Sequence, residues 1–231
     1  MKLLAFELAT EACSVALWDD GEVRERFEVA PRRHAELALP WADALLAEAG
    51  LAKSQLDAIA IGRGPGAFTG VRLAIAVGQG IALALDRPMV AVSTLAALAW
   101  QAGEGLVLAS IDARMGEVYA GAYRREGDAQ TLLAAESVGP PEAVELPGGA
   151  NGWHAVGTGL AACDGALQSR LARRLARVDA AALPHAADVA RLAAMCAARG
   201  ELLAPEKVEP TYLRNQVALT LAQQQALRDA R

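Results

Sequence analysis

The sequence predicts an α/β protein built from two similar halves, of which the second is less regular. Each half begins with an apolar strand that ends in an acidic residue, Glu7 or Asp112, and continues through a turn into another strand. The first half then alternates strand-length apolar runs with longer helical stretches. A chain of 231 residues with 54% hydrophobic residues can bury the large core that such a fold needs.

In the first half, residues 1–103, the expected order is βββαβαβα. Its strands are expected at 3–9, 13–18, 22–29, 56–61 and 88–92, and its helices at 34–49, 69–86 and 94–102. The second half, residues 104–214, is expected to have strands at 106–111, 117–124, 130–136 and 155–156, and helices at 159–176 and 185–199. Residues 215–231 are expected to form a C-terminal helix or tail. Two βββαβαβα-type halves, the second degenerate, suggest the duplicated fold of actin, Hsp70 ATPase domains and sugar kinases, in which nucleotide binds between the halves.

Composition excludes several classes of function. A net charge of −5 argues against autonomous nucleic-acid binding, which depends on Lys and Arg to neutralise phosphates. The three cysteines, Cys13, Cys163 and Cys196, are scattered and predict no disulfide framework. Glu7 comes too early for a signal peptide, and no uninterrupted apolar run approaches about 18 residues, so we expect a cytoplasmic protein without a membrane span.

A glycine-rich segment, Gly62 to Arg72, separates the predicted strand 56–61 from the helix 69–86. Thr69 is the expected N-cap of that helix. Free backbone N–H groups at a helix N-terminus can bind phosphate, but no Walker lysine follows here. A tight connection that allows close packing is the favoured alternative. The residues concerned are Gly62, Arg63, Gly64, Pro65, Gly66, Thr69, Gly70 and Arg72.

The helix 69–86 is apolar on all sides and contains two interior glycines. In it, four-residue rows of bulky side chains alternate with rows of small ones, and such rows interlock when helices cross. Each interior glycine costs about 1 kcal/mol relative to alanine, so close approach of another element is the expected reason for it. That element is either part of the same chain or another protein.

Few residues suggest catalysis. Glu7 and Asp112 could orient a metal-bound water in an ATPase of this architecture, or could be ordinary carboxylates at strand ends. Gly157-Thr158-Gly159 could approach a phosphate or simply start a helix. The sequence has no H-x-x-x-H pair and no G-x-S-x-G, so neither a metal site nor a serine nucleophile is expected. A basic stripe on the predicted helix 159–176 is expected to be solvated, with contact to RNA as the less favoured alternative. It consists of Arg170, Arg173, Arg174 and Arg177.

Five segments resemble the bacterial TsaB (YeaZ) family: 11–18, 62–72, 92–95, 111–119 and 210–214. The resemblance implies a non-catalytic member of the actin/Hsp70-like (ASKHA, ribonuclease H-like) superfamily. Such proteins pair with the catalytic paralogue TsaD and, with TsaE, serve synthesis of N6-threonylcarbamoyladenosine beside the anticodon of ANN-decoding tRNAs. Their carbamoyl donor, threonylcarbamoyl-AMP, comes from a separate synthase, TsaC. The family was formerly classed with M22 peptidases.

Two residues depart from the family pattern, Glu7 where Asp is usual and Ala67 where Ser is usual. The resemblance implies no intrinsic cofactor or metal, with ATP or ADP and a metal on TsaD and ADP near the TsaB–TsaD interface. It also implies homodimers without TsaD, and tRNA contact only through the complex. The first two helices would form the partner surface, for which we expect Leu37, Trp41, Leu45, Leu73, Ala74, Val77, Gly78, Gly80 and Ile81. One alternative is an ATP-dependent phosphotransferase or hydrolase. A second is an M22-type metallopeptidase, which the absence of a histidine pair in the sequence disfavours.

Overall fold

The first half of the chain forms a five-stranded sheet in a computed structural model that describes residues 1–214. Its strands are β1 (Lys2–Glu7), β2 (Ala12–Asp19), β3 (Glu22–Val29), β4 (Ala58–Gly62) and β5 (Met89–Val92). They lie in the order β3-β2-β1-β4-β5, with β1 antiparallel to β2 and parallel to β4. β1 and β4 are almost entirely buried, as their continuous apolar sequences predict.

The second half repeats this sheet. Its strands are β6 (Gly105–Arg114), β7 (Glu117–Glu126), β8 (Ala129–Gly139), β9 (Trp153–Val156) and β10 (Leu175–Asp179). Their order, β10-β9-β6-β7-β8, matches the first sheet strand for strand, and β6 is likewise antiparallel to β7 and parallel to β9. The predicted duplication is therefore confirmed.

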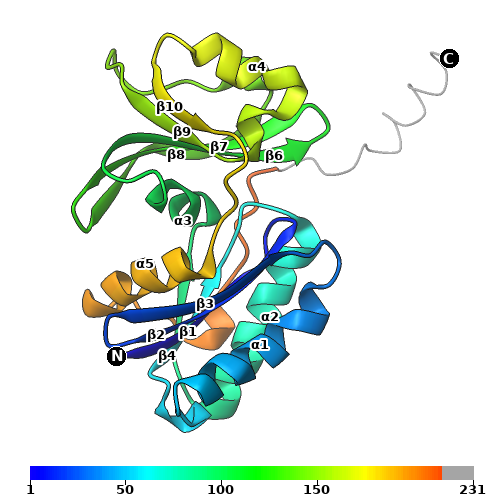
Figure 1. Ribbon diagram of the computed structural model, residues 1–231, viewed down its shortest axis with the longest axis vertical. Helices are drawn as coiled ribbons and strands as arrows, with labels where there is room; N and C mark the ends of the chain where they lie inside the picture. The colour runs from blue at the N-terminus through cyan, green and yellow to red at the C-terminus, as the bar shows by residue number, and fades with distance from the viewer. Residues whose placement is uncertain (215–231) are drawn as a thin grey trace, which may run out of the picture.

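The helices are α1 (His34–Glu48), α2 (Phe68–Leu85), α3 (Thr94–Trp100), α4 (Ala162–Leu171) and α5 (Ala186–Ala198). α1 and α2 cover the outer face of the first sheet (Figure 1). The helices α3 and α5 lie between the two sheets, and each packs on the sheet of the other half. Leu95 and Leu98 of α3 contact the second sheet, whereas Val189 and Ala193 of α5 contact the first. Residue 103 therefore divides the chain into two halves of similar strand order, but each half contributes a helix that packs on the sheet of the other.

The second half differs from the prediction between residues 159 and 179. No helix spans 159–176: α4 ends at Leu171, and residues 175–179 form β10. Left-handed backbone at Cys163, Asp164 and Gly165 interrupts the start of α4. Within the connection between β8 and β9, a 3-10 turn at Pro141–Ala143 stands where the first half has α1.

The prediction of a basic stripe on one helix is also wrong, because the four arginines do not lie on the same helix. Arg170 and Arg174 donate hydrogen bonds to backbone carbonyls of the loop 141–150, including Pro141 and Ala150, and hold that loop in place. Arg173 and Arg177 are exposed, Arg173 after the end of α4 and Arg177 in β10.

α2 is long and apolar enough to cross a membrane by length and composition alone, the one such helix within residues 1–214. In the structure it lies against β4 and β1 of the first sheet. It begins at Phe68 after Ala67, which has no side-chain cap, so the predicted N-cap Thr69 lies inside the helix. The predicted C-terminal helix or tail, residues 215–231, lies outside the described residues.

Candidate functional site

One face of α2 packs on the first sheet so closely that it has no room for larger side chains. Gly78 is buried on this face, and a Cβ atom there would lie 2.7 Å from Ile61 Cγ2 and 2.8 Å from Met89 Cε. The other buried residues of the face are Gly70, Val71, Ala74, Ile75 and Ala82. One of the two interior glycines of α2 is therefore explained by this chain's own core.

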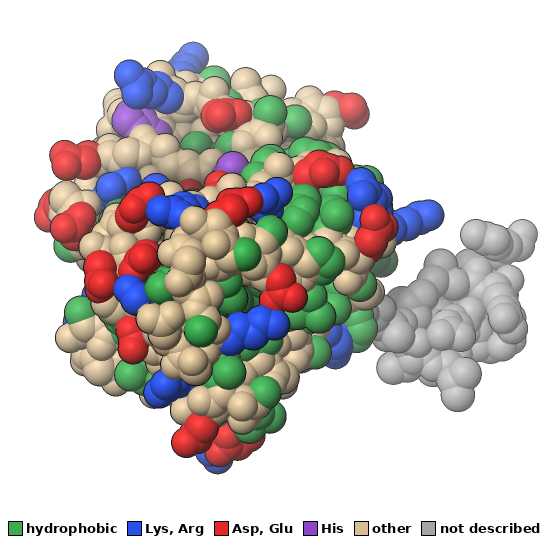
Figure 2. Space-filling model, turned by 60° about the horizontal axis from the view of Figure 1, so that its bottom comes forward, with side chains coloured by type: hydrophobic (Ala, Val, Ile, Leu, Met, Phe, Trp, Pro, Cys, Tyr) green, Lys and Arg blue, Asp and Glu red, His purple; other side chains and the backbone are tan. Residues whose placement is uncertain are grey.

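The opposite face of α2 is open. We define the exposed seam as the residues along this face whose spacing alternates between four and three: Thr69, Leu73, Ala76, Gly80, Leu83 and Arg87. Leu73 and Arg87 are half-buried and the other four are exposed. Leu83 is 64% exposed, and a Cβ atom at Gly80 would meet nothing within 4 Å. Figure 2 shows hydrophobic side chains gathered on the side of the molecule where α2 lies.

This geometry corrects part of the predicted partner surface. Four of its residues are buried in this chain's own core and cannot contact a partner: Leu37, Leu45, Ala74 and Gly78. Four others are half-buried against that core and keep part of their surface open: Trp41, Leu73, Val77 and Ile81. Gly80 is fully on the open face. Ala76 and Leu83, which the prediction did not include, are exposed on the same face as Gly80.

A C-terminal strap, residues 201–214, runs beside α2 and ties it to the second half. Gln79 of α2 donates hydrogen bonds to the carbonyls of Pro205 and Val208, at 2.8 and 3.3 Å. At the far end, Arg214 donates to the Ala113 carbonyl at 3.2 Å and pairs with Glu117 at the β6–β7 turn. The strap therefore ties the Gln79 side of α2, in the first half, to the β6–β7 turn of the second half.

The N-terminal end of α2 carries an exposed stack of side chains. The guanidinium carbon of Arg72 lies 3.2 Å from the centroid of the Phe68 ring and 5.1 Å from that of Tyr212 on the strap. Phe68 and Tyr212 are 59% and 52% exposed. Cation–π contact on two aromatic rings fixes the direction of the guanidinium group.

The glycine segment folds back onto the turn between β1 and β2. A Cβ atom at Gly66 would lie 2.4 Å from the Ala9 carbonyl oxygen, and one at Gly70 would lie 2.0 Å from the Leu8 carbonyl oxygen. The N–H of Ala67 donates to the Ala9 oxygen at 2.7 Å. The segment therefore does not fit a phosphate group, because its close approaches are already made to this chain's own backbone.

The other residues of the segment serve the same connection. Gly64 adopts a φ of 89°, which favours glycine, and Pro65 is buried beside it. The backbone of Arg63 donates to Val92 and accepts from Thr211 of the strap, while its side chain is exposed. The prediction of a tight strand-to-helix connection matches these contacts.

Glu7 is buried beneath the glycine segment, which corrects its assignment to the cleft. A Cβ atom at Gly62 would lie 1.9 Å from Glu7 Oε2, so only glycine leaves room for this carboxyl. The Ala9 N–H and the Thr94 hydroxyl donate to the two carboxyl oxygens at 2.8 and 2.9 Å. Burial raises the pKa of Glu7 to about 7, although both hydrogen bonds act to lower it.

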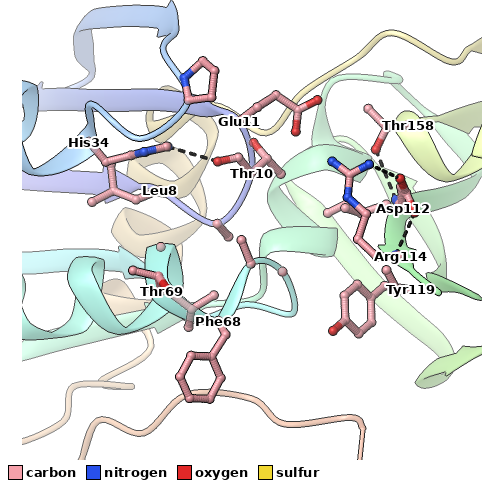
Figure 3. A pocket seen from close by; sticks show the side chains of 18 of the residues that line it. Leu8, Thr10, Glu11, His34, Phe68, Thr69, Asp112, Arg114, Tyr119 and Thr158 are labelled. Atoms are coloured by element: carbon pink, nitrogen blue, oxygen red, sulfur yellow. Dashed lines mark hydrogen bonds and ion pairs between the residues drawn. The ribbon is translucent and has the colours of Figure 1, made fainter. Parts of the chain in front are cut away.

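A cleft of about 1010 Å³ lies between the two halves (Figure 3). Asp112 lines it, but Glu7 does not. The Asp112 carboxylate pairs with Arg114 at 2.8 Å and accepts from the Arg114 N–H at 2.7 Å. Thr10, Glu11 and His34 face Asp112 from the first half, and the His34 ring lies 3.0 Å from the Thr10 carbonyl oxygen.

Gly157-Thr158-Gly159 packs against β6. Cβ atoms at Gly157 and Gly159 would lie 2.2 and 2.1 Å from the carbonyl and hydroxyl oxygens of Ser110. Thr158 lines the cleft, and its hydroxyl accepts from the Asp112 N–H at 3.2 Å. Nowhere in the described chain do three or more His, Cys, Asp or Glu side chains group as metal ligands would.

Known proteins match almost the whole chain. The family model for TsaD, tRNA N6-adenosine threonylcarbamoyltransferase, matches residues 28–221. The Escherichia coli tRNA threonylcarbamoyladenosine biosynthesis protein TsaB is 44% identical over 94% of this chain and 96% of its own length. The Haemophilus influenzae protein of the same name is 37% identical over 94% and 95%.

Solved structures agree with these sequence matches. A Pseudomonas aeruginosa protein described as similar to the peptidase YeaZ has a TM-score of 0.86 and 48% identity, over 92% of this chain and 99% of its own. A second structure, YeaZ from Pseudomonas aeruginosa, has a TM-score of 0.83 and 47% identity over the same shares. The chain therefore belongs to the TsaB (YeaZ) family and shares the domain that the TsaD family model describes.

Proposed function

We propose that this chain is a non-catalytic subunit that docks on TsaD and thereby supports synthesis of N6-threonylcarbamoyladenosine beside the anticodon of ANN-decoding tRNAs. The observation that carries the proposal is the exposed seam of α2, because an 18-residue apolar helix with one face open presents a surface that a partner can bury. The names of the Escherichia coli and Haemophilus influenzae relatives support the same pathway.

The proposal assigns the chemistry to TsaD. The glycine segment of this chain is closed onto its own β1–β2 turn, and the first-half acid, Glu7, is engaged by Ala9 and Thr94 away from the cleft. ATP or ADP and the metal would bind TsaD, with ADP near the interface between the subunits. TsaE would complete the assembly, and tRNA would bind through the complex in the cytoplasm.

Docking would act on TsaD by differential affinity. A subunit that binds one conformation of its partner more tightly than another shifts the population toward that conformation. Without TsaD, the same open face would pair with a second copy of this chain. Both kinds of pairing use α2, with the half-buried Trp41 of α1 as a further contact.

The cleft of about 1010 Å³ is the observation that favours an alternative, an ATP-dependent phosphotransferase or hydrolase. In that enzyme Asp112, which lines the cleft, would act on a bound nucleotide. Calorimetry with ATP and an ATPase assay on the purified chain distinguish the two functions. Tight binding with turnover would favour the enzyme, and neither is expected for a docking subunit.

Leu83→Arg should strongly reduce the activity that TsaD gains from this chain, without unfolding the chain. A charge at an exposed apolar position of an interface must be buried on docking, so threonylcarbamoyl transfer by TsaD should fall by about tenfold or more. The measurement is transfer to tRNA in a mixture of TsaD, TsaE and this chain. Leu132→Arg, at a 45% exposed position of β8, is the matched control and should retain activity. Full activity with Leu83→Arg would exclude the seam as the docking face.

A further inference from the structure

The first turn of α5 is capped by side chains from the other half of the molecule. α5 begins at Ala186 and has no side-chain cap of its own. Instead, the Ala186 N–H donates to the Ser14 hydroxyl of β2 at 2.8 Å. The Ala187 N–H donates to the Glu25 carboxylate of β3 at 3.0 Å. Because the first N–H groups of a helix have no partner within it, these two bonds hold the start of α5 on the first sheet.

The mostly buried carboxylate of Glu25 joins the parts of this cap. It also accepts from the Ser14 hydroxyl at 2.7 Å, and its second oxygen lies 2.9 Å from Nδ1 of His185, the residue before α5. The Phe27 ring stacks on the His185 imidazole, with centroids 4.1 Å apart and planes 12° apart. We call Ser14, Glu25 and His185 the α5 latch. It lies where residues 180–185 cross from β10 of the second sheet to α5 on the first.

The charges around His185 balance only when its imidazole is protonated. The acids that face it are Glu25 on β3 and Asp188 on α5, and the other cation is Arg191 of α5. Arg191 pairs with Asp188 at 2.7 Å, and β2 contributes only the neutral Ser14. With a protonated imidazole, two carboxylates therefore face two cations. A neutral imidazole leaves one carboxylate in excess at a site that is largely out of water.

The hydrogen bond with the Glu25 carboxylate raises the pKa of His185 above its ordinary value of 6.5, although burial acts to lower it. Burial acts to raise the pKa of Glu25, but its hydrogen bonds lower that pKa, so Glu25 stays ionised near neutral pH. The folded state therefore holds the His185 proton more tightly than the unfolded chain does. The latch is at full strength below about pH 6.5 and weakens as the pH rises through the raised pKa of His185.

We propose that the α5 latch is a pH-sensitive contact between the halves, which holds the start of α5 on the first sheet firmly when His185 is protonated and more loosely when it is neutral. A neutral imidazole can still donate from Nδ1 to Glu25, but a charge-assisted hydrogen bond is about twice as strong as a neutral one. The stacked ring of Phe27 also favours the cation, because an aromatic face attracts positive charge. The inference goes beyond the proposed function, since no residue of the latch belongs to the exposed seam.

Hydrogen exchange in the full chain without TsaD tests the latch, because Ala186 and Ala187 supply its two amides. NMR should show that their protection, corrected for intrinsic exchange, falls about threefold to tenfold from pH 6 to pH 8.5. The protection is taken relative to that of the Ala193 amide in the same helix, so that changes in the stability of the whole chain cancel. A constant relative protection over this range would overturn the proposal.

Two variants separate His185 from other titrating groups. His185→Gln can still donate to Glu25 but does not titrate, so the fall in relative protection should disappear. His154→Gln replaces a half-buried histidine of the second sheet and should keep the fall. A fall that persists in His185→Gln would show that another group titrates, and the latch would then be wrong.

The proton shifts of the imidazole give a second measurement, which does not need the His185 variant to fold. His185 should titrate with a midpoint above pH 6.5 in the wild type, and the midpoint should be lower in Glu25→Gln. Equal midpoints would overturn the pairing on which the latch depends. None of these results bears on docking to TsaD, which the Leu83→Arg variant tests separately.

Discussion

Gly78→Leu is expected to lower the free energy of unfolding by about 3 kcal/mol or more, whereas Gly80→Leu should leave it unchanged or raise it slightly. The two glycines are two residues apart but lie on opposite faces of α2. A side chain at position 78 must displace Ile61 and Met89 from the core between α2 and the first sheet. A side chain at position 80 meets nothing within 4 Å and gains the better helix propensity of leucine.

Chemical denaturation of the two variants measures this difference directly. The effects on association should not follow the effects on stability. Gly80→Leu should fold normally but bind a partner more weakly, because its side chain fills the gap at the centre of the exposed seam. Gly78→Leu should lose stability first, and any loss of pairing should follow from unfolding. Equal stability of the two variants would contradict the close packing of Gly78 against the first sheet.

Between about pH 5 and pH 8, the free energy of unfolding of the wild-type chain should fall because of Glu7, and Glu7→Gln should remove this part of the fall. Burial raises the pKa of Glu7 to about 7 in the folded chain, above its value of 4.5 when unfolded. The folded state therefore holds the proton more tightly, and the free energy of unfolding falls as the pH rises from about 4.5 through 7. A shift of this size corresponds to about 3 kcal/mol, with full stability below the lower value.

Glutamine keeps the shape of the side chain and can accept from the Ala9 N–H while the Thr94 hydroxyl turns to accept from its amide. Denaturation of wild type and variant at pH 5 and pH 8 gives the difference due to Glu7, because the ion pair between His185 and Glu25 is common to both chains. Glu104→Gln, at an exposed position, is the control and should behave like the wild type. Parallel pH profiles for wild type and Glu7→Gln would show that this carboxyl is not the titrating group.

The duplicated sheets could be predicted because their central strands are buried on both faces and so appear as continuous apolar runs, as in β4 and β6. β10 could not, since it is an edge strand with four of its five residues exposed and has no apolar alternation. Its backbone pairing with β9 is a tertiary contact that leaves no local pattern in Leu175–Asp179. The packing of α3 on the second sheet and of α5 on the first sheet could not be predicted either, because it is also a tertiary contact without a local sequence pattern.

At the site, the alternating rows of small and bulky side chains predicted that α2 packs closely against another element. They did not reveal which row faces the sheet. Ala74 and Gly78 form one small row and Ala76 and Gly80 another, and the two differ only in what the sheet places beside them. The spacing of four and three in the exposed seam was a signal available in the sequence. Glu7 and Asp112 are alike in sequence, since each is an acid at the end of an apolar strand, and the sequence does not reveal that Gly62 leaves space for the Glu7 carboxyl to turn inward.

Analytical ultracentrifugation of this chain mixed with TsaD from the same organism tests the central claim most directly. We predict a single species with the summed mass of one copy of each protein for the wild type, and two separate species when Gly80→Trp replaces it at the same concentrations. Separate sedimentation of wild type and TsaD, or an undiminished complex with Gly80→Trp, would contradict docking through the open face of α2.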